Sequence, residues 1–215
     1  MKHFFAIIFI LFNALTFLAQ EKVNQFNESG ERNGVWKKYY SNERIRYVGQ
    51  FKNGKEVGVF KFYSVKSSTF PTAIKVFSRD SNIADVQFFT EKGVIESEGK
   101  MEGKKRIGLW TYYFPDGKTI ISEENYENGL LNGESKTFYK DGKVTELSHF
   151  KNGKLDGNIK RYASNGTLID DLNYKEGKLH GYAKYYNIEG KLIYAGEYEN
   201  DLKVGKWEYN SDVRN

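Results

Sequence analysis

The 215-residue chain contains no cysteine, two prolines and three histidines. Without cysteine it can form no disulfide, and it offers no thiol for lipoprotein acylation, nucleophilic catalysis or metal binding. His149 and His180 are the only histidines beyond the first 20 residues, and neither lies in a pattern typical of a metal site or a catalytic dyad. We therefore expect no metal, no cofactor and a fold stabilised by packing and hydrogen bonds.

Long apolar runs are also absent, apart from residues 4–18. That run is shorter than the roughly 20 residues that a spanning helix needs, and charged residues follow it from Glu21. It predicts a secretory signal peptide over residues 1–19, cleaved near Ala19, and hence export to the periplasm, the outer envelope or the medium. Phe17 is bulky for a position near a cleavage site, which leaves a retained N-terminal anchor as the alternative.

An excess of charge of one sign is missing as well. The 33 basic residues nearly balance the 28 acidic ones, and both kinds are interspersed along the chain. A nucleic-acid-binding protein would instead gather basic residues on one face. We expect no nucleic-acid partner.

The sequence does contain a repeat of about 24 residues. Segments 151–174 and 175–198 are two copies that agree at 11 of 24 positions. Repetition at this period indicates stacked supersecondary units. Seven of the eight copies have a glycine at the same position, called the marker glycine: Gly34, Gly58, Gly108, Gly133, Gly157, Gly181 and Gly205. In the degenerate third copy, around residues 78–101, Ala84 replaces it.

Each copy reads as a β-hairpin. Runs rich in the 16 tyrosines and 16 phenylalanines alternate with Asn-Gly and Asp-Gly pairs, which are strong signals for tight turns. Consecutive hairpins with short connections pair with their neighbours. The predicted fold class is all-β: an elongated single-layer antiparallel β-meander of about eight hairpin repeats, with roughly sixteen strands about 4.8 Å apart.

The predicted organisation is a signal peptide at 1–19, a short segment at 20–26, the repeat array at 27–210 and a tail at 211–215. Within the array, residues 64–85 contain no glycine and no two-residue turn signal. This stretch is either a tolerated insertion or a functional loop.

Side chains alternate between two faces along each predicted strand. Residues two after the marker glycine are mostly apolar, and those three after it are mostly polar. Residues five after it are aromatic, so either a bulge intervenes or both faces carry aromatics. Exposed aromatic strips mark partner surfaces, and the candidate partner-binding face comprises Trp36, Phe60, Trp110, Tyr113, Tyr162, Tyr186 and Trp207.

Residues 49–58 (GQFKNGKEVG) and 196–207 (GEYENDLKVGKW) resemble MORN repeats. The pattern from Asn152 to Gly166 resembles the bacterial variant found in proteins described as YwqK-like antitoxins. The resemblance covers residues 27 to about 210 and departs at the third copy and at Asp201. It implies an elongated sheet for binding and assembly without catalytic residues, phospholipid binding in some eukaryotic members, and an antitoxin or immunity role as an alternative.

Catalysis has weak support in the sequence. The carboxylate pairs Glu96/Glu98, Glu123/Glu124 and Asp170/Asp171 would need a cleft to act as a hydrolase acid and nucleophile, and a flat meander predicts none. Lysines after the turn glycines suit solubility or, alternatively, contact with anionic lipid. The sequence thus predicts an exported, non-enzymatic β-repeat protein that binds another protein or an envelope component, and it does not predict the oligomeric state.

Overall fold

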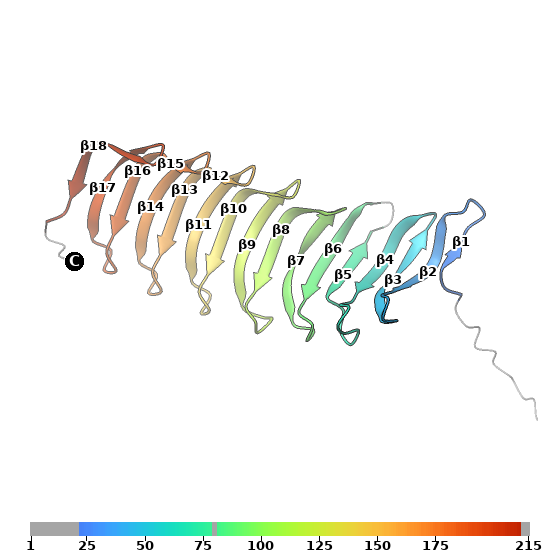
Figure 1. The fold of residues 1–215 in the computed structure, drawn as a ribbon. Helices are drawn as coiled ribbons and strands as arrows, with labels where there is room; N and C mark the ends of the chain where they lie inside the picture. The colour runs from blue at the N-terminus through green and yellow to red at the C-terminus, as the bar shows by residue number, and fades with distance from the viewer. Residues whose placement is uncertain (1–21, 79–80, 212–215) are drawn as a thin grey trace, which may run out of the picture.

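The computed structural model describes residues 22–78 and 81–211, which form one open antiparallel β-sheet of 18 strands (Figure 1). Neighbouring strands in the sheet are neighbours in the chain, so the chain advances as a meander from β1 at one end to β18 at the other. The predicted all-β hairpin meander is confirmed. No helix in the described ranges could cross a membrane. The predicted signal peptide, residues 1–19, and most of the predicted tail lie outside those ranges.

The first nine strands are β1 (Gln25–Phe26), β2 (Arg32–Tyr39), β3 (Ile45–Lys52), β4 (Lys55–Phe62), β5 (Ala73–Phe77), β6 (Ile83–Phe89), β7 (Ile95–Glu102), β8 (Lys105–Tyr113) and β9 (Ile120–Glu127). The other nine are β10 (Leu130–Phe138), β11 (Val144–Lys151), β12 (Lys154–Leu155), β13 (Gly157–Tyr162), β14 (Leu168–Lys175), β15 (Lys178–Leu179), β16 (Gly181–Tyr186), β17 (Leu192–Glu199) and β18 (Leu202–Tyr209). Strands β12 and β13 both pair with β11, and β15 and β16 both pair with β14, so each couple is one interrupted strand.

Asn-Gly pairs form the turns that join consecutive strands along one long side of the sheet, where the strands end. Asn53 and Gly54 have φ angles of 48° and 74°, as a type I′ turn requires. Asn152 and Gly153 repeat the pair at 51° and 80°. The short turns that the sequence predicted therefore set the hairpin register.

The irregular stretch that the sequence marked at 64–85 resolves into a loop, residues 63–72, between β4 and β5. The loop lies along the neighbouring turns: Asn42 Nδ2 donates to Val65 O at 3.1 Å, and Ser64 Oγ donates to Glu91 Oε1 at 2.7 Å. The third copy itself is a regular hairpin, because β6 and β7 pair along their whole length. The irregularity belongs to the connection before that copy.

One face of the sheet, the aromatic face, carries Trp36, Phe60, Phe88, Trp110, Tyr112 and Trp207. Trp110 is 0% exposed although no second layer covers it. Its ring lies 5.9 Å from that of Phe88 and 6.5 Å from that of Tyr126, measured between centroids. The strands bend along their length (Figure 1), and side chains of adjacent strands enclose the ring. The aromatic face is therefore the core of the protein.

Glycines on the return strands make room for these rings. A Cβ added at Gly99 would lie 2.6 Å from the Trp110 ring, and one at Gly49 would lie 2.2 Å from Phe60. Neither glycine has a positive φ, so space and not backbone conformation requires it. Later repeats combine other sizes at the equivalent positions: Ser148 with Ile159, and Leu172 with Ala183. In each of these pairs a large residue on one strand thus goes with a smaller residue on the adjacent strand.

The substitution Gly99→Ala tests this size rule. We expect it to lower the free energy of unfolding by about 1–3 kcal/mol, because the added methyl overlaps the Trp110 ring. The double substitution Gly99→Ser with Trp110→Ile copies the Ser148/Ile159 combination and should cost less than the sum of its single substitutions. Urea unfolding of the four variants measures both effects. A neutral Gly99→Ala, or simple additivity of the pair, would contradict the rule.

The substitution Glu43→Gly tests the backbone strain in the turns at the opposite ends of the strands. Glu43 has a φ of 63° where Gly142 of a later repeat has 83°. Removing this left-handed strain should raise the free energy of unfolding by about 0.5–1 kcal/mol. Gly142→Ala is the matched control, since the new Cβ would have no atom within 4 Å, and it should lower stability by about 1 kcal/mol. Changes of the same sign in the two variants would argue against backbone strain as the cause.

Candidate partner-binding groove

The seven aromatic residues of the predicted partner-binding face do not form one exposed surface. Trp110 and Phe60 are 0% and 1% exposed, so they pack inside the protein and present almost no surface to a partner. Trp36 and Trp207 lie on the same aromatic face, half-buried near the two ends of the sheet. The remaining three predicted residues, Tyr113, Tyr162 and Tyr186, lie on the other side of the sheet, called here the opposite face.

Tyr113 shows why the aromatics divide. It follows Tyr112 in β8, so alternation turns its side chain to the opposite face. There its hydroxyl donates to Glu98 Oε1 at 2.6 Å. The register does shift between Tyr112 and Tyr113, but the extra residue, Ile121, lies in the return strand. Both possibilities that the sequence left open therefore hold: a bulge is present, and both faces carry aromatics.

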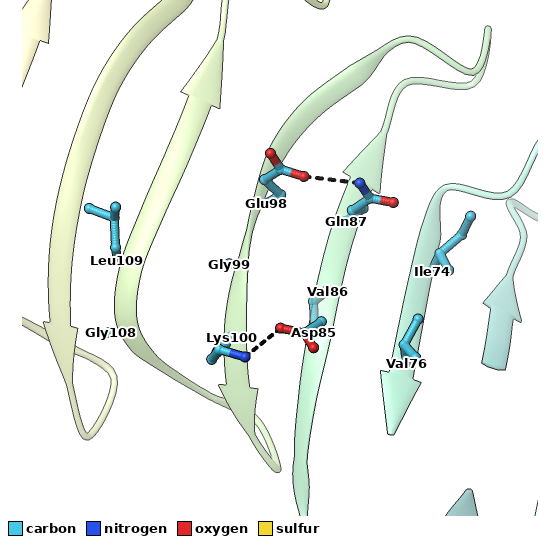
Figure 2. A pocket seen from close by; sticks show the side chains of 10 residues that line it. All are labelled: Ile74, Val76, Asp85, Val86, Gln87, Glu98, Gly99, Lys100, Gly108 and Leu109. Atoms are coloured by element: carbon cyan, nitrogen blue, oxygen red, sulfur yellow. Dashed lines mark hydrogen bonds and ion pairs between the residues drawn. The ribbon is translucent and has the colours of Figure 1, made fainter. Parts of the chain in front are cut away.

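A groove of about 570 Å³ lies on the opposite face over strands β5 to β8 (Figure 2). Val76 and Leu109, which are 42% and 52% exposed, form its apolar walls together with Ile74. Val59, 49% exposed, pairs with Val76 from the adjacent strand and extends this apolar surface. The side chains come from four consecutive strands, so the groove is formed by the sheet itself and not by loops.

Two polar pairs form the floor of the groove between these walls (Figure 2). Lys100 Nζ lies 2.7 Å from Asp85 Oδ1, and Gln87 Nε2 donates to Glu98 Oε2 at 2.9 Å. Both partners of the ion pair are more than half exposed, so it stabilises the fold by less than about 1 kcal/mol. With two carboxylates and one ammonium, the lining is slightly acidic.

Hydrogen bonds set the ionisation of Glu98. The Tyr113 hydroxyl and, to a lesser extent, the Gln87 amide lower the pKa of the Glu98 carboxyl below its ordinary 4.5. Burial, together with the bond to Glu98, raises the pKa of Tyr113 to about 12. At neutral pH the floor of the groove therefore holds an ionised carboxylate and a neutral phenol.

The carboxylate pairs considered for hydrolysis are mostly separated by the sheet. Glu123 pairs with Thr111 and Lys136, whereas Glu124 lies on the aromatic face, where Tyr126 donates to it at 2.6 Å. Asp170 and Asp171 are likewise consecutive residues of one strand and point to opposite faces. Neither pair can flank one bond of a substrate. In the described ranges no three His, Cys, Asp or Glu side chains are placed to hold a metal ion.

The residue directly after the marker glycine gave a partial signal for the groove in the sequence. The residue directly after the marker glycine is Val35, Val59 or Leu109 in three of the first four repeats. It is Glu134, Asn158 or Lys206 in three of the last four. Of the apolar residues at this position, Leu109 lines the groove and Val59 extends its apolar surface, whereas Val35 in β2 and Tyr182 in β16 lie outside it.

The pH dependence of Tyr113→Phe tests the described floor. Because the pKa of Glu98 is lowered, its stabilising contribution is complete above pH 4.5 and is lost as pH falls through the folded-state value. At pH 7 the variant should lose less than about 1 kcal/mol of stability, since Glu98 is partly screened by solvent. The difference from the unmodified protein should shrink as pH falls through the folded-state pKa of Glu98.

Tyr162→Phe is the matched control for this experiment. Tyr162 occupies the equivalent position, but its hydroxyl makes no hydrogen bond among the described residues. Urea unfolding at several pH values should show no pH-dependent difference for it. A Tyr113→Phe effect that is independent of pH would contradict the assigned bond.

Comparison with curated proteins finds no match. A family model, described as the MORN repeat variant, matches residues 32–53 and 131–152. The first match spans β2, β3 and the start of the next turn, and the second spans most of β10, all of β11 and Asn152. Each match is thus one hairpin of the array. The repeat unit of this chain is similar to the MORN repeat variant over these two hairpins.

Proposed function

We propose that this chain is an exported, non-enzymatic β-repeat scaffold that binds a partner protein in the groove over β5 to β8. The observation that carries the proposal is the exposed apolar surface of Val59, Val76 and Leu109 beside the groove on the opposite face. Apolar surface gathered beside a concave site is typical of protein contacts. Export rests on the signal peptide predicted at residues 1–19.

The aromatic face supports this choice of site indirectly. Its central rings, Trp110 and Phe60, are enclosed by neighbouring side chains, so they stabilise the sheet and present almost no surface of their own to a partner. Groups on the opposite face have no such neighbours above them. A partner can bury the walls of the groove without disturbing the packing of the core.

The charge of the groove favours a protein over an anionic polymer or lipid. Asp85 and Glu98 outnumber Lys100, so phosphate groups would be repelled from the floor. A protein segment can instead place apolar side chains against the walls and amide groups against the floor. Contact with anionic lipid would have to use the lysines at the turns, such as Lys154 and Lys178, which are exposed at one edge.

The absence of catalysis is part of the proposal. It is supported by the separation of Glu123 from Glu124 and of Asp170 from Asp171 across the sheet. The antitoxin or immunity role implied by the resemblance is not proposed, because no feature of the groove points to a toxin.

Partner binding is tested with the mature chain, residues 20–215, as bait for proteins of the envelope fraction. The dissociation constant of the purified complex is then compared between variants by calorimetry. Leu109→Asp should weaken binding at least about tenfold, because it places a charge against the buried apolar contact. The fold should be retained, since Leu109 is half exposed.

Ile188→Asp is the matched control. Ile188 is 57% exposed and lies in the turn between β16 and β17, far along the sheet from the groove. It should leave the dissociation constant within about twofold. Equal affinity of all three proteins, or equal losses in the two variants, would overturn the assignment of the groove.

A further inference from the structure

A second cavity lies on the aromatic face, beside the turn that joins β7 to β8. It measures about 420 Å³ and is called here the basic notch. Three cationic side chains and no carboxylate line it: Lys104, Lys105 and Arg106. Phe88 and Met101 supply an apolar wall.

Aromatic rings hold the Arg106 guanidinium in place. Its Cζ lies 4.7 Å from the ring centroid of Trp110 and 5.5 Å from that of Tyr126. Among the described residues it makes no ion pair, and Glu124 on the same face is bound by Tyr126 instead. Arg161 contrasts with it, because its guanidinium is 2.7 Å from Glu146. Arg106 therefore lines the notch, and its guanidinium N–H groups have no acceptor among the described residues.

A purely structural role explains part of this arrangement. Arg106 precedes Trp110 by four residues, and Lys203 precedes Trp207 by four in the same way, with Nζ 4.1 Å from the ring. Three of the repeats with a smaller buried residue, Ser135, Ile159 and Ala183, hold a leucine at this position: Leu131, Leu155 and Leu179. A cation here caps a tryptophan. Lysine can serve as that cap, so capping alone does not require the guanidinium.

We propose that the basic notch binds the carboxylate of an acidic side chain from a peptide segment of a partner. The planar guanidinium matches a carboxylate through two parallel hydrogen bonds, and stacking on the rings fixes its orientation in advance. One guanidinium group binds one carboxylate in this way. Phe88 and Met101 lie where an apolar neighbour of the acidic residue can pack.

The two lysines play a different part in the notch. Both are exposed, as turn or strand-end residues, so they attract acidic segments over about 10 Å and need not contact the bound group. The notch lies on the face away from the groove over β5 to β8. It is a separate site, and its occupation does not depend on partner binding in that groove.

The Nε–H signal of Arg106 in the NMR spectrum of the mature chain provides the test. We use the peptide N-acetyl-Phe-Glu-amide as the probe and N-acetyl-Phe-Gln-amide as its uncharged match. The acidic peptide should shift the Arg106 signal to saturation with a millimolar dissociation constant. The glutamine peptide should bind at least about fivefold more weakly.

Two variants separate binding from capping. Arg106→Lys keeps a cation over the Trp110 ring, as Lys203 does over Trp207, but loses the two parallel hydrogen bonds of the guanidinium. Binding of the acidic peptide should therefore weaken several-fold, as measured from the Met101 methyl signal. Arg106→Leu copies Leu131 and should abolish binding while urea unfolding confirms that the protein is folded. No saturable shift, equal binding of the two peptides, or full binding to Arg106→Lys would overturn the proposal. Tighter binding of inorganic phosphate or phosphatidic acid vesicles would also overturn it.

Discussion

The close contact between an aromatic ring and a glycine on the preceding strand is the constraint on which the rest of the structure depends. A sheet of one layer has nothing above it, so its apolar side chains can be buried only against one another. Trp110 achieves full burial because Gly99 leaves the space beneath its ring. Gly196 does the same for Trp207 at the C-terminal end. The turns set the register, and these contacts make the register stable.

Because of this constraint the two faces of the sheet have different roles. The aromatic face is occupied by its own packing, and the cations that border it cap the tryptophans. The opposite face carries the exposed apolar walls of the groove and the ion pair between them. Substitution at positions such as Leu109 therefore changes the proposed binding surface without altering the core.

The sequence was sufficient to predict the hairpin meander, because the glycine period and the Asn-Gly pairs act locally. It was insufficient for the partner face, because burial depends on contacts between strands. Gly99 and Trp110 are separate in the sequence, and nothing in either repeat alone shows that they touch. Tyr113 could not be assigned to a face until the extra residue was located in the return strand. The groove uses Val76, whose strand follows the long loop and lacks a marker glycine.

Solvent access to Trp110 tests most directly whether the large rings of the aromatic face form the core of the protein. Trp36→Phe and Trp207→Phe, with Phe60 as the precedent for phenylalanine at this position, leave Trp110 as the only tryptophan. Quenching of its fluorescence by acrylamide is then measured in the folded protein. Weak quenching and a blue-shifted emission are expected, because the indole of Trp110 is closed to water. Quenching as strong as that of free tryptophan would contradict this expectation.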